Sequence, residues 1–308
     1  MKHNWTLLHP GVMPPRRKGH VMAYDSTIGT IILFGVASGT HGHLNDTWAW
    51  EENTWKLLHP SLAPSPRVDA SIIHDTTTGQ AFLFGGVDSS GDLLGDTWIW
   101  DGKNWTQQHV STAPSARSFA NIAYDITRQT VVLFGGEMGQ GRISPALNDT
   151  WLWTGTRWQQ AQPVTLPPPR TGASMAYDAR TQQIVLFGGG NNFALADTWL
   201  WNGATWSQAR PSASPPARVH ASMAYDAATE QVVLFGGENG SVELNDTWVW
   251  DGTTWIQQQV SQGPGGGYSS AAYDAVHHSI LAFSSAGTKQ NETNETWMWT
   301  GTTWKQLD

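Results

Sequence analysis

Five arginines recur at matching points of this chain, and they are the residues best suited to bind a ligand. They are Arg17, Arg67, Arg117, Arg170 and Arg218. A guanidinium group offers five N–H donors in a planar fork that matches carboxylate and phosphate oxygens. If the five side chains converge on one surface, they would hold an anionic ligand. In the alternative, each arginine pairs with an aspartate that recurs at similar spacing, and the arginines hold the fold together.

The position two residues after each arginine changes from copy to copy. It is occupied in turn by Gly19, Asp69, Phe119, Gly172, His220 and, in a sixth copy that lacks the arginine, Tyr268. Repeated packing alone would not change a residue in this way, so we interpret the position as the mouth of a central channel. Asp69 is either a ligand group or an ion-pair partner of Arg67. Phe119 and Tyr268 offer aromatic surfaces to a ligand.

Four further side chains belong to the predicted binding surface. Glu137 and Glu238 follow glycine pairs, either as ligand groups or as partners of the arginines. Asn121 is expected to line the channel, because serines align with it in four other copies (Ser71, Ser174, Ser222 and Ser270). Phe193 is an aromatic residue that the repeat pattern does not explain.

Three side chains could also move a proton. Tyr268, His220 and His20 carry acid–base groups, and histidine titrates near pH 7. With arginines holding a substrate carboxylate, they would suit a uronate lyase or an epimerase. Copies five, six and one are neighbours in a closed ring, so these side chains could converge. In the alternative, both histidines are hydrogen-bonded residues of the channel rim.

No metal site and no cofactor are expected. The chain has no cysteine, which excludes disulfides, thiolate metal sites and cysteine nucleophiles. His41 and His43 share one glycine-rich loop but have no carboxylate partner there, so they are weak candidates for metal ligands. No glycine-rich phosphate-binding loop leads into a helix.

Six copies of one unit must position these residues. Its clearest mark is Asp-Thr-Trp-x-Trp followed by another Trp nine residues after the acid, as in Asp46 to Trp55. The mark recurs at Asp96, Asp149, Asp197, Asp246 and, with a glutamate, Glu295, at intervals of 48 to 53 residues. This period predicts an all-β, six-bladed propeller with four antiparallel strands per blade. We place its blades, within one domain over 1–308, at about 10–59, 60–109, 110–162, 163–210, 211–259 and 260–308.

Loop lengths indicate which face of the propeller binds. In the fifth copy, strands are expected over 218–225, 231–235 and 247–250 and from residue 255 onwards. The connection between the second and third strands varies most, with an offset of 9 to 14 residues from the first residue of the glycine-pair position to the next acid. The first strand begins where the second ends, so the arginines should share a face with these loops. Loops on a rigid scaffold commonly carry function, and we expect this face to bind the ligand.

The motifs Arg-x-x-x-small-x-x-Tyr-Asp, Val-Leu-Phe-Gly-Gly and Trp-x-Trp-Asp-Gly-x-x-Trp resemble Kelch repeats, as in galactose-oxidase-like six-bladed propellers. The resemblance covers residues 5–307, and it implies that arginines at similar positions grip acidic peptides, as in Kelch adaptor domains. Three departures occur: Gly35-Val36 and Ser284-Ser285 replace glycine pairs, and Gly266 replaces the arginine of the sixth copy. The copper-radical site of galactose oxidase needs a cysteine-linked tyrosine, which this chain lacks.

Composition narrows the possible partners. The formal net charge is −8 and no Lys/Arg-rich run occurs, so a nucleic-acid partner is not expected. No apolar stretch is long enough for a membrane helix. The sequence starts within a repeat unit, so no signal peptide is expected, and the compartment stays undecided.

Seven segments compete for the fourth strand of six blades. Residues 4–8 precede the first blade and residues 304–307 end the last, and either segment could complete the last blade. The protein is expected to be a monomer, although the spare strand could pair with another chain.

These observations favour a binding propeller that captures an acidic peptide, a protein or a charged glycan on its loop-rich face. The enzyme described above is one alternative, and a purely architectural domain is another. A deep pocket with a titrating tyrosine or histidine would favour the enzyme. Arginines that all pair with aspartates would favour the architectural domain.

Overall fold

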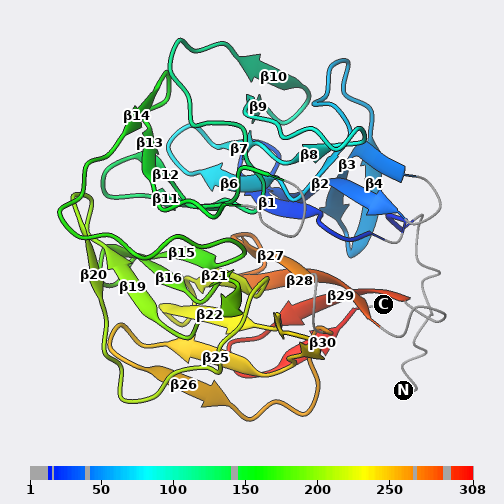
Figure 1. The fold of residues 1–308 in the computed structure, drawn as a ribbon. Coiled ribbons are helices and arrows are strands. Elements are labelled where there is room, and N and C mark those ends of the chain that lie inside the picture. Colours follow the sequence, from blue (N-terminus) through cyan, green and yellow to red (C-terminus); the bar gives the residue numbers. More distant parts are fainter. Residues whose placement is uncertain are drawn as a thin grey trace, which may run out of the picture.

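The computed structural model describes residues 13–15, 17–38, 42–139, 145–265, 269–286 and 293–307. Throughout these ranges the chain forms strands and turns, without a helix. Figure 1 shows six sheets arranged around a central axis, with strands β1, β6, β11, β15, β21 and β27 innermost. The predicted all-β, six-bladed propeller is therefore confirmed.

Each blade is a four-stranded antiparallel sheet whose strands run in chain order from the axis to the rim. The first three blades are β1 (Val21–Asp25), β2 (Thr30–Ser38), β3 (Gly42–Glu51) and β4 (Thr54–Leu58); β6 (Ser71–Asp75), β7 (Gln80–Phe84), β9 (Thr97–Trp100) and β10 (Trp105–Gln108); and β11 (Asn121–Asp125), β12 (Thr130–Phe134), β13 (Thr150–Trp153) and β14 (Trp158–Gln160). The last three are β15 (Ser174–Asp178), β16 (Gln183–Phe187), β19 (Thr198–Trp201) and β20 (Trp206–Gln208); β21 (Ser222–Asp226), β22 (Gln231–Phe235), β25 (Thr247–Trp250) and β26 (Trp255–Gln258); and β27 (Ser269–Asp274), β28 (Ser279–Ala286), β29 (Thr293–Trp299) and β30 (Trp304–Gln306).

Three short two-stranded ladders involve the loops between second and third strands, and in one of them the partner strand, β5, lies in the segment before the first strand of its blade. They pair β5 (Arg67–Val68) with β8 (Val87–Asp88), β17 (Gly190–Asn191) with β18 (Phe193–Ala194), and β23 (Glu238–Asn239) with β24 (Val242–Glu243). We call the side of the propeller that carries these loops the mouth face.

The second strand of each blade is apolar because both of its faces are covered. Ile31, Ile32, Leu33 and Phe34 of β2 are each 0% exposed. Ile31 and Leu33 pack in a cluster shared with the sixth blade, and Ile32 and Phe34 pack in one shared with the second blade. A strand buried on both sides needs a continuous run of β-branched and aromatic residues, which explains the repeated Val-Leu-Phe segments.

Tryptophans of the outermost strands tie each blade to the preceding one. Trp206 Nε1 donates to Thr150 Oγ1 over 3.0 Å, and its ring lies 5.2 Å from that of Phe134. Equivalent indole-to-threonine bonds join the five other pairs of blades (Trp55–Thr296, Trp105–Thr47, Trp158–Thr97, Trp255–Thr198 and Trp304–Thr247). Each blade therefore supplies the ring and the N–H that complete its neighbour's core.

The ring closes between the sixth and first blades through the same contact. Trp55 Nε1 donates to Thr296 Oγ1 over 3.2 Å, and the Trp55 ring lies 5.5 Å from Phe283. Strand β30, near the carboxyl end, forms the outer edge of the last blade. The competing segment, residues 4–8, lies outside the described residues, and pairing of a spare strand with another chain stays a prediction.

Trp206→Ala should lower the free energy of unfolding by about 3–5 kcal/mol, because it leaves a cavity between two blades and an unpaired threonine. Trp206→Phe keeps most of the volume and should lose less. Urea unfolding followed by tryptophan fluorescence measures both. Val164→Ala is the control, since Val164 is 94% exposed and should change stability by less than about 0.5 kcal/mol. A loss below about 1 kcal/mol in Trp206→Ala would show that the contact is not part of the core.

Candidate functional site

Each of the five arginines is buried and paired with the aspartate of its own blade. In the third blade, Arg117 Nη1 lies 2.6 Å from Asp149 Oδ1, and Nη2 lies 2.9 Å from Oδ2. Arg117 also donates to the carbonyls of Gly135 and Ser115, both over 3.0 Å. Its exposed fraction is 1%. The other pairs are Arg17–Asp46, Arg67–Asp96, Arg170–Asp197 and Arg218–Asp246.

The arginine backbone meanwhile bonds to the preceding blade. Arg117 N donates to Leu94 O over 3.0 Å, and Gly86 N donates to Arg117 O over 3.0 Å. A Cβ on Gly85, whose φ is +70°, would lie 2.6 Å from that same carbonyl, which explains the glycine there. The arginines therefore join neighbouring blades, and their geometry favours the architectural alternative over ligand binding.

The mouth residues, defined as Gly19, Asp69, Phe119, Gly172 and His220, form a ring of backbone hydrogen bonds. Four of them donate their N–H to the carbonyl of the counterpart in the preceding blade, at 3.1 Å for Asp69 and Phe119, 3.4 Å for Gly172 and 2.7 Å for His220, and Gly19 accepts the first of these bonds. All five have a φ between +51° and +74°, the left-handed region that glycine favours. The sixth counterpart, Tyr268, lies outside the described residues.

The central channel behind this ring is a hollow of about 220 Å³, which we call the first hollow. Ser71, Ser174 and Ser222 line it and donate to backbone carbonyls of the following blade over 2.6–2.7 Å. Asn121, predicted to line the channel, does so, with Nδ2 donating to Phe134 O over 3.1 Å. Methionine and isoleucine side chains also line the hollow (Met22, Ile72, Ile122, Met175 and Met223).

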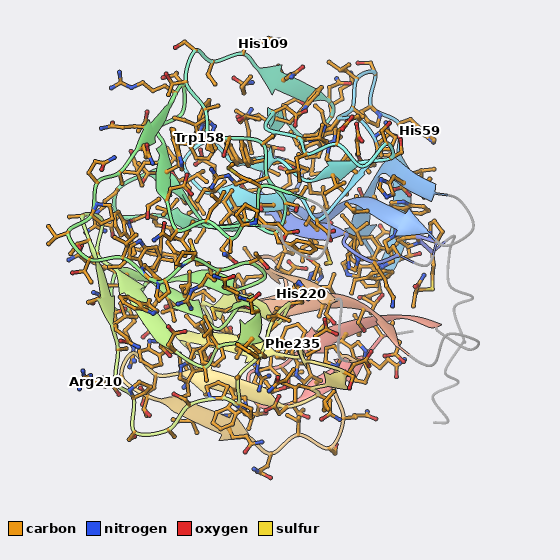
Figure 2. All side chains as sticks on the ribbon, viewed as in Figure 1. His59, His109, Trp158, Arg210, His220 and Phe235 are labelled. Carbon is orange, nitrogen blue, oxygen red and sulfur yellow. The ribbon has the colours of Figure 1, made fainter. Side chains whose placement is uncertain are left out.

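Phe119 and His220 meet across the mouth above Gly172. Their ring centroids lie 5.0 Å apart with an interplanar angle of 39°. A Cβ on Gly172 would lie 2.7 Å from the His220 ring, so the glycine makes room for this contact. His220 Nδ1 lies 3.3 Å from Glu238 Oε1, and burial lowers the pKa of His220 although Glu238 opposes this. Figure 2 labels His220 towards the middle of the ring, whereas His109 and Arg210 lie at the rim.

Asp69 sits where the first hollow adjoins a second hollow of about 530 Å³. Both hollows are lined by Asp69 and Phe119, and Glu137 and Asp88 add carboxylates to the second. Burial, with a smaller contribution from the charge of Glu137, raises the pKa of Asp69 to about 7. The expected ion pair with Arg67 does not form, since Arg67 pairs with Asp96. Glu137 accepts a hydrogen bond from Ser118 Oγ over 3.4 Å.

His20 lines the first hollow together with His220, whereas Phe193 lines neither hollow. His20 is 5% exposed, and its Nε2 lies 3.1 Å from Phe283 O at the junction of the first and sixth blades. Burial, followed by the charge of Arg17, lowers the pKa of His20 to about 3. Phe193 lies on β18 and is 81% exposed. Of the three proton-transfer candidates of the enzyme alternative, His20 and His220 line the same hollow, and Tyr268 lies outside the described residues.

Two exposed apolar residues of the mouth face were not predicted from the sequence. Met138 and Val242, in the loops of the third and fifth blades, are 46% and 60% exposed. Their only sequence signal is an apolar residue inside a glycine-rich or asparagine-rich turn. His43 lines the second hollow, whereas His41 lies outside the described residues. Within the described ranges, no group of three or more histidine, aspartate or glutamate residues could hold a metal ion.

No helix of the described chain is long and apolar enough to cross a membrane. A family model, described as the KLHDC2/KLHL20/DRC7 Kelch-repeats domain, matches residues 1–152 and again residues 126–308. No curated protein matches the chain. The two family matches together extend over all six blades, in agreement with the resemblance seen in the repeat motifs.

Acid should destabilise the protein through the arginine-paired carboxylates. Burial alone would raise the pKa of Asp96, Asp149 and Asp197, but the hydrogen bonds and charges of their arginines outweigh it and hold each pKa below its usual range. Because the pKa is lower in the folded protein, this stabilisation is complete above the unfolded pKa of about 3.9. It is lost as the pH falls through the folded pKa.

Asp149→Asn tests this directly, since it leaves a buried arginine without its counter-charge. The substitution should remove about 3–5 kcal/mol of stability at pH 7 and make unfolding less dependent on pH below about 4. Urea unfolding at pH 7, 4 and 3 measures both effects. Asp92→Asn, at an exposed carboxylate, is the control, and equal stabilities of the two variants at pH 7 would contradict the prediction.

Asp69→Asn should instead raise the melting temperature at pH 8. The folded protein keeps a proton on Asp69 that the unfolded chain releases, so stability falls as the pH rises from about 4 to about 7. The amide removes this loss. The melting temperature of the variant relative to the parent should therefore increase between pH 5 and pH 8. A difference that does not change with pH would show that Asp69 titrates normally.

Proposed function

Because the chain belongs to the KLHDC2/KLHL20/DRC7 Kelch-repeats domain family, we propose that it is a protein-interaction propeller that receives a segment of its partner over the channel mouth. Kelch propellers are typical of protein-interaction domains. The single observation that carries the proposal is the pair of adjoining hollows, which share Asp69 and Phe119. When one side chain of the partner segment enters one hollow, an adjacent residue of the same segment can occupy the other hollow.

The residues around the mouth support this placement because they do not repeat. The arginines, aspartates and tryptophans are alike in nearly every blade, and they are occupied by contacts between strands and blades. The mouth residues differ from blade to blade although they share one backbone conformation. Their side chains are therefore free to vary for recognition while the backbone ring stays constant.

Exposed apolar side chains also lie in three loops of the mouth face. Met138, Phe193 and Val242 lie in the loops of three consecutive blades, and Phe193 is 81% exposed. The opposite face also exposes apolar residues, among them Ile126 in the turn between β11 and β12. Those turns have one length throughout the repeats, so the mouth face is the better candidate for specific recognition.

The five arginines give little indication of the sign of the partner's charge. An anionic partner is the expectation that follows from five accessible arginines. Each of these guanidiniums is at most 1% exposed and bound to a carboxylate, so they provide little support for that expectation. Recognition on this face instead depends on the mouth residues and the loops.

A displayed library of random peptides, selected on the full chain, tests the proposal. Selected peptides should compete with one another for one site. Their affinity should fall about tenfold in Phe119→Ala or Phe193→Ser, as expected for substitution of an aromatic contact. Fluorescence anisotropy with labelled peptides measures the affinities.

Ile126→Ser is the matched control on the opposite face, because Ile126 is 46% exposed and contacts neither hollow. It should leave the affinities unchanged. Peptides that lose affinity in Ile126→Ser but not in the mouth-face variants would place the interaction elsewhere. Failure to enrich any peptide would also count against the proposal.

A further inference from the structure

We propose that the partner segment is basic and places a lysine or arginine side chain at the channel mouth, against Asp69, Glu137 and the ring of Phe119. This inference rests on the proposed function and deepens it by naming the chemistry of the partner. It reverses the sign of charge expected from the arginines, and it follows from how the described carboxylates differ in their surroundings.

Asp69 differs from the aspartates that support the fold. Asp96 and Asp149 each receive two hydrogen bonds from an arginine and one from a tryptophan indole. No described residue donates a hydrogen bond to the Asp69 carboxylate, which is half-buried and faces Glu137, another acid. A buried carboxylate without a donor or a counter-charge destabilises the protein.

The backbone conformation of Asp69 is also unfavourable for the stability of the protein. Its φ is +54°, and the equivalent positions in the first and fourth blades hold Gly19 and Gly172. Glycine would adopt this φ with less strain than aspartate does, and it has no carboxylate that must be desolvated. Residues that oppose stability in two ways at a hollow are commonly kept for binding or catalysis.

The acidic groups that line the two hollows outnumber the lysines and arginines there, although Asp69 carries a full charge only above its raised pKa of about 7. The described bases that line the hollows are the histidines His20, His43 and His220. Asp88 and Glu137 join Asp69 in the second hollow, and no described lysine or arginine lines either hollow. Lys18 is exposed beside Gly19 but lines neither of them. Part of this charge has a local role, since Asp88 Oδ1 accepts from the backbone N–H of Ser90 and Asp92. The sum still repels an anion and attracts a cation, as does the net charge of −8.

Phe119 explains why a long basic side chain fits better than a small cation. Its ring lines both hollows and is held on one side by His220 at 5.0 Å. The aliphatic stem of a lysine or arginine can lie on such a ring while its charged head reaches the neighbouring carboxylates. The exposed loop residues Phe193 and Met138 would contact the flanking apolar positions of the segment.

Peptide mixtures with one fixed central residue test the proposal. Four sets of capped nonapeptides carry Lys, Arg, Gln or Glu at the centre, with all other positions randomised over uncharged residues. Fluorescence anisotropy at 50 mM and 300 mM salt measures their binding to the full chain. The Lys or Arg set should bind at least about tenfold more tightly than the Gln set, with the difference reduced by salt. The Glu set should bind most weakly.

Asp69→Asn and Glu137→Gln should each reduce the preference for a basic centre about tenfold, as expected when one carboxylate of a desolvated pair is removed. Glu243→Gln, at an exposed carboxylate on β24 of the same face, is the matched control and should keep the preference. The melting temperature separates binding from folding, because Asp69→Asn should melt at the same or a higher temperature than the parent. Loss of binding in a variant that keeps its stability supports a role in recognition.

The peptide-binding results distinguish a wrong partner charge from a wrong binding face. If all four sets bind equally and lose affinity in Phe193→Ser, the mouth face binds peptides but the basic partner is wrong. If the Glu set binds best, or if the preference for Lys survives in the Asp69→Asn, Glu137→Gln double variant, the basic partner is likewise wrong. If no set binds, or if binding is lost only in Ile126→Ser, the proposed function itself fails.

Discussion

The buried arginine–aspartate pair is the interaction on which the rest of this propeller depends. The Arg117 side chain joins the end of the second strand to the start of the third within its own blade, through Gly135 O and Asp149. Its backbone bonds to Leu94 and Gly86 of the preceding blade. One residue therefore fixes both the inside of a blade and the angle to its neighbour. Such a pair is costly to break because either partner alone would be an uncompensated charge, so its recurrence in five blades makes the ring rigid.

That rigidity explains how the mouth can vary. Two residues after each arginine, the chain passes the channel in a left-handed conformation and bonds to its counterpart in the next blade. The buried arginine–aspartate pair holds this backbone in place whichever side chain the position carries. Gly19 and Gly172 leave space that the neighbouring Asp69 and His220 side chains occupy. The result is a constant backbone that carries Asp69, Phe119 and His220 between two glycines, so that the side chains vary around the ring, which is the arrangement a specific binding surface needs.

The mouth face therefore carries two kinds of acidic residue, those paired with arginine and Asp69, and their electrostatic surroundings are opposite. The aspartates that pair with the buried arginines accept hydrogen bonds from arginine and indole donors, and the arginine neutralises their charge. Among the described residues Asp69 has no such donor, and burial of its carboxylate raises its pKa. Arginine would be the obvious ligand-binding group from its chemistry alone. In the folded chain it is neutralised, and the electrostatic character of the mouth passes to the carboxylates and to Phe119.

The sequence alone determined the number of blades, the four strands of each and the faces they bury, because these follow from the spacing of tryptophans, glycines and Val-Leu-Phe runs along the chain. It also located the mouth, since Gly19, Asp69, Phe119, Gly172 and His220 break a repeat that is otherwise regular. It left open whether Arg117 faces a ligand or Asp149, because the two residues lie 32 positions apart. Only the tertiary structure decided this. Whether a charge is available for binding depends on what folding places within hydrogen-bonding distance of it, and residue spacing along the chain does not report that distance.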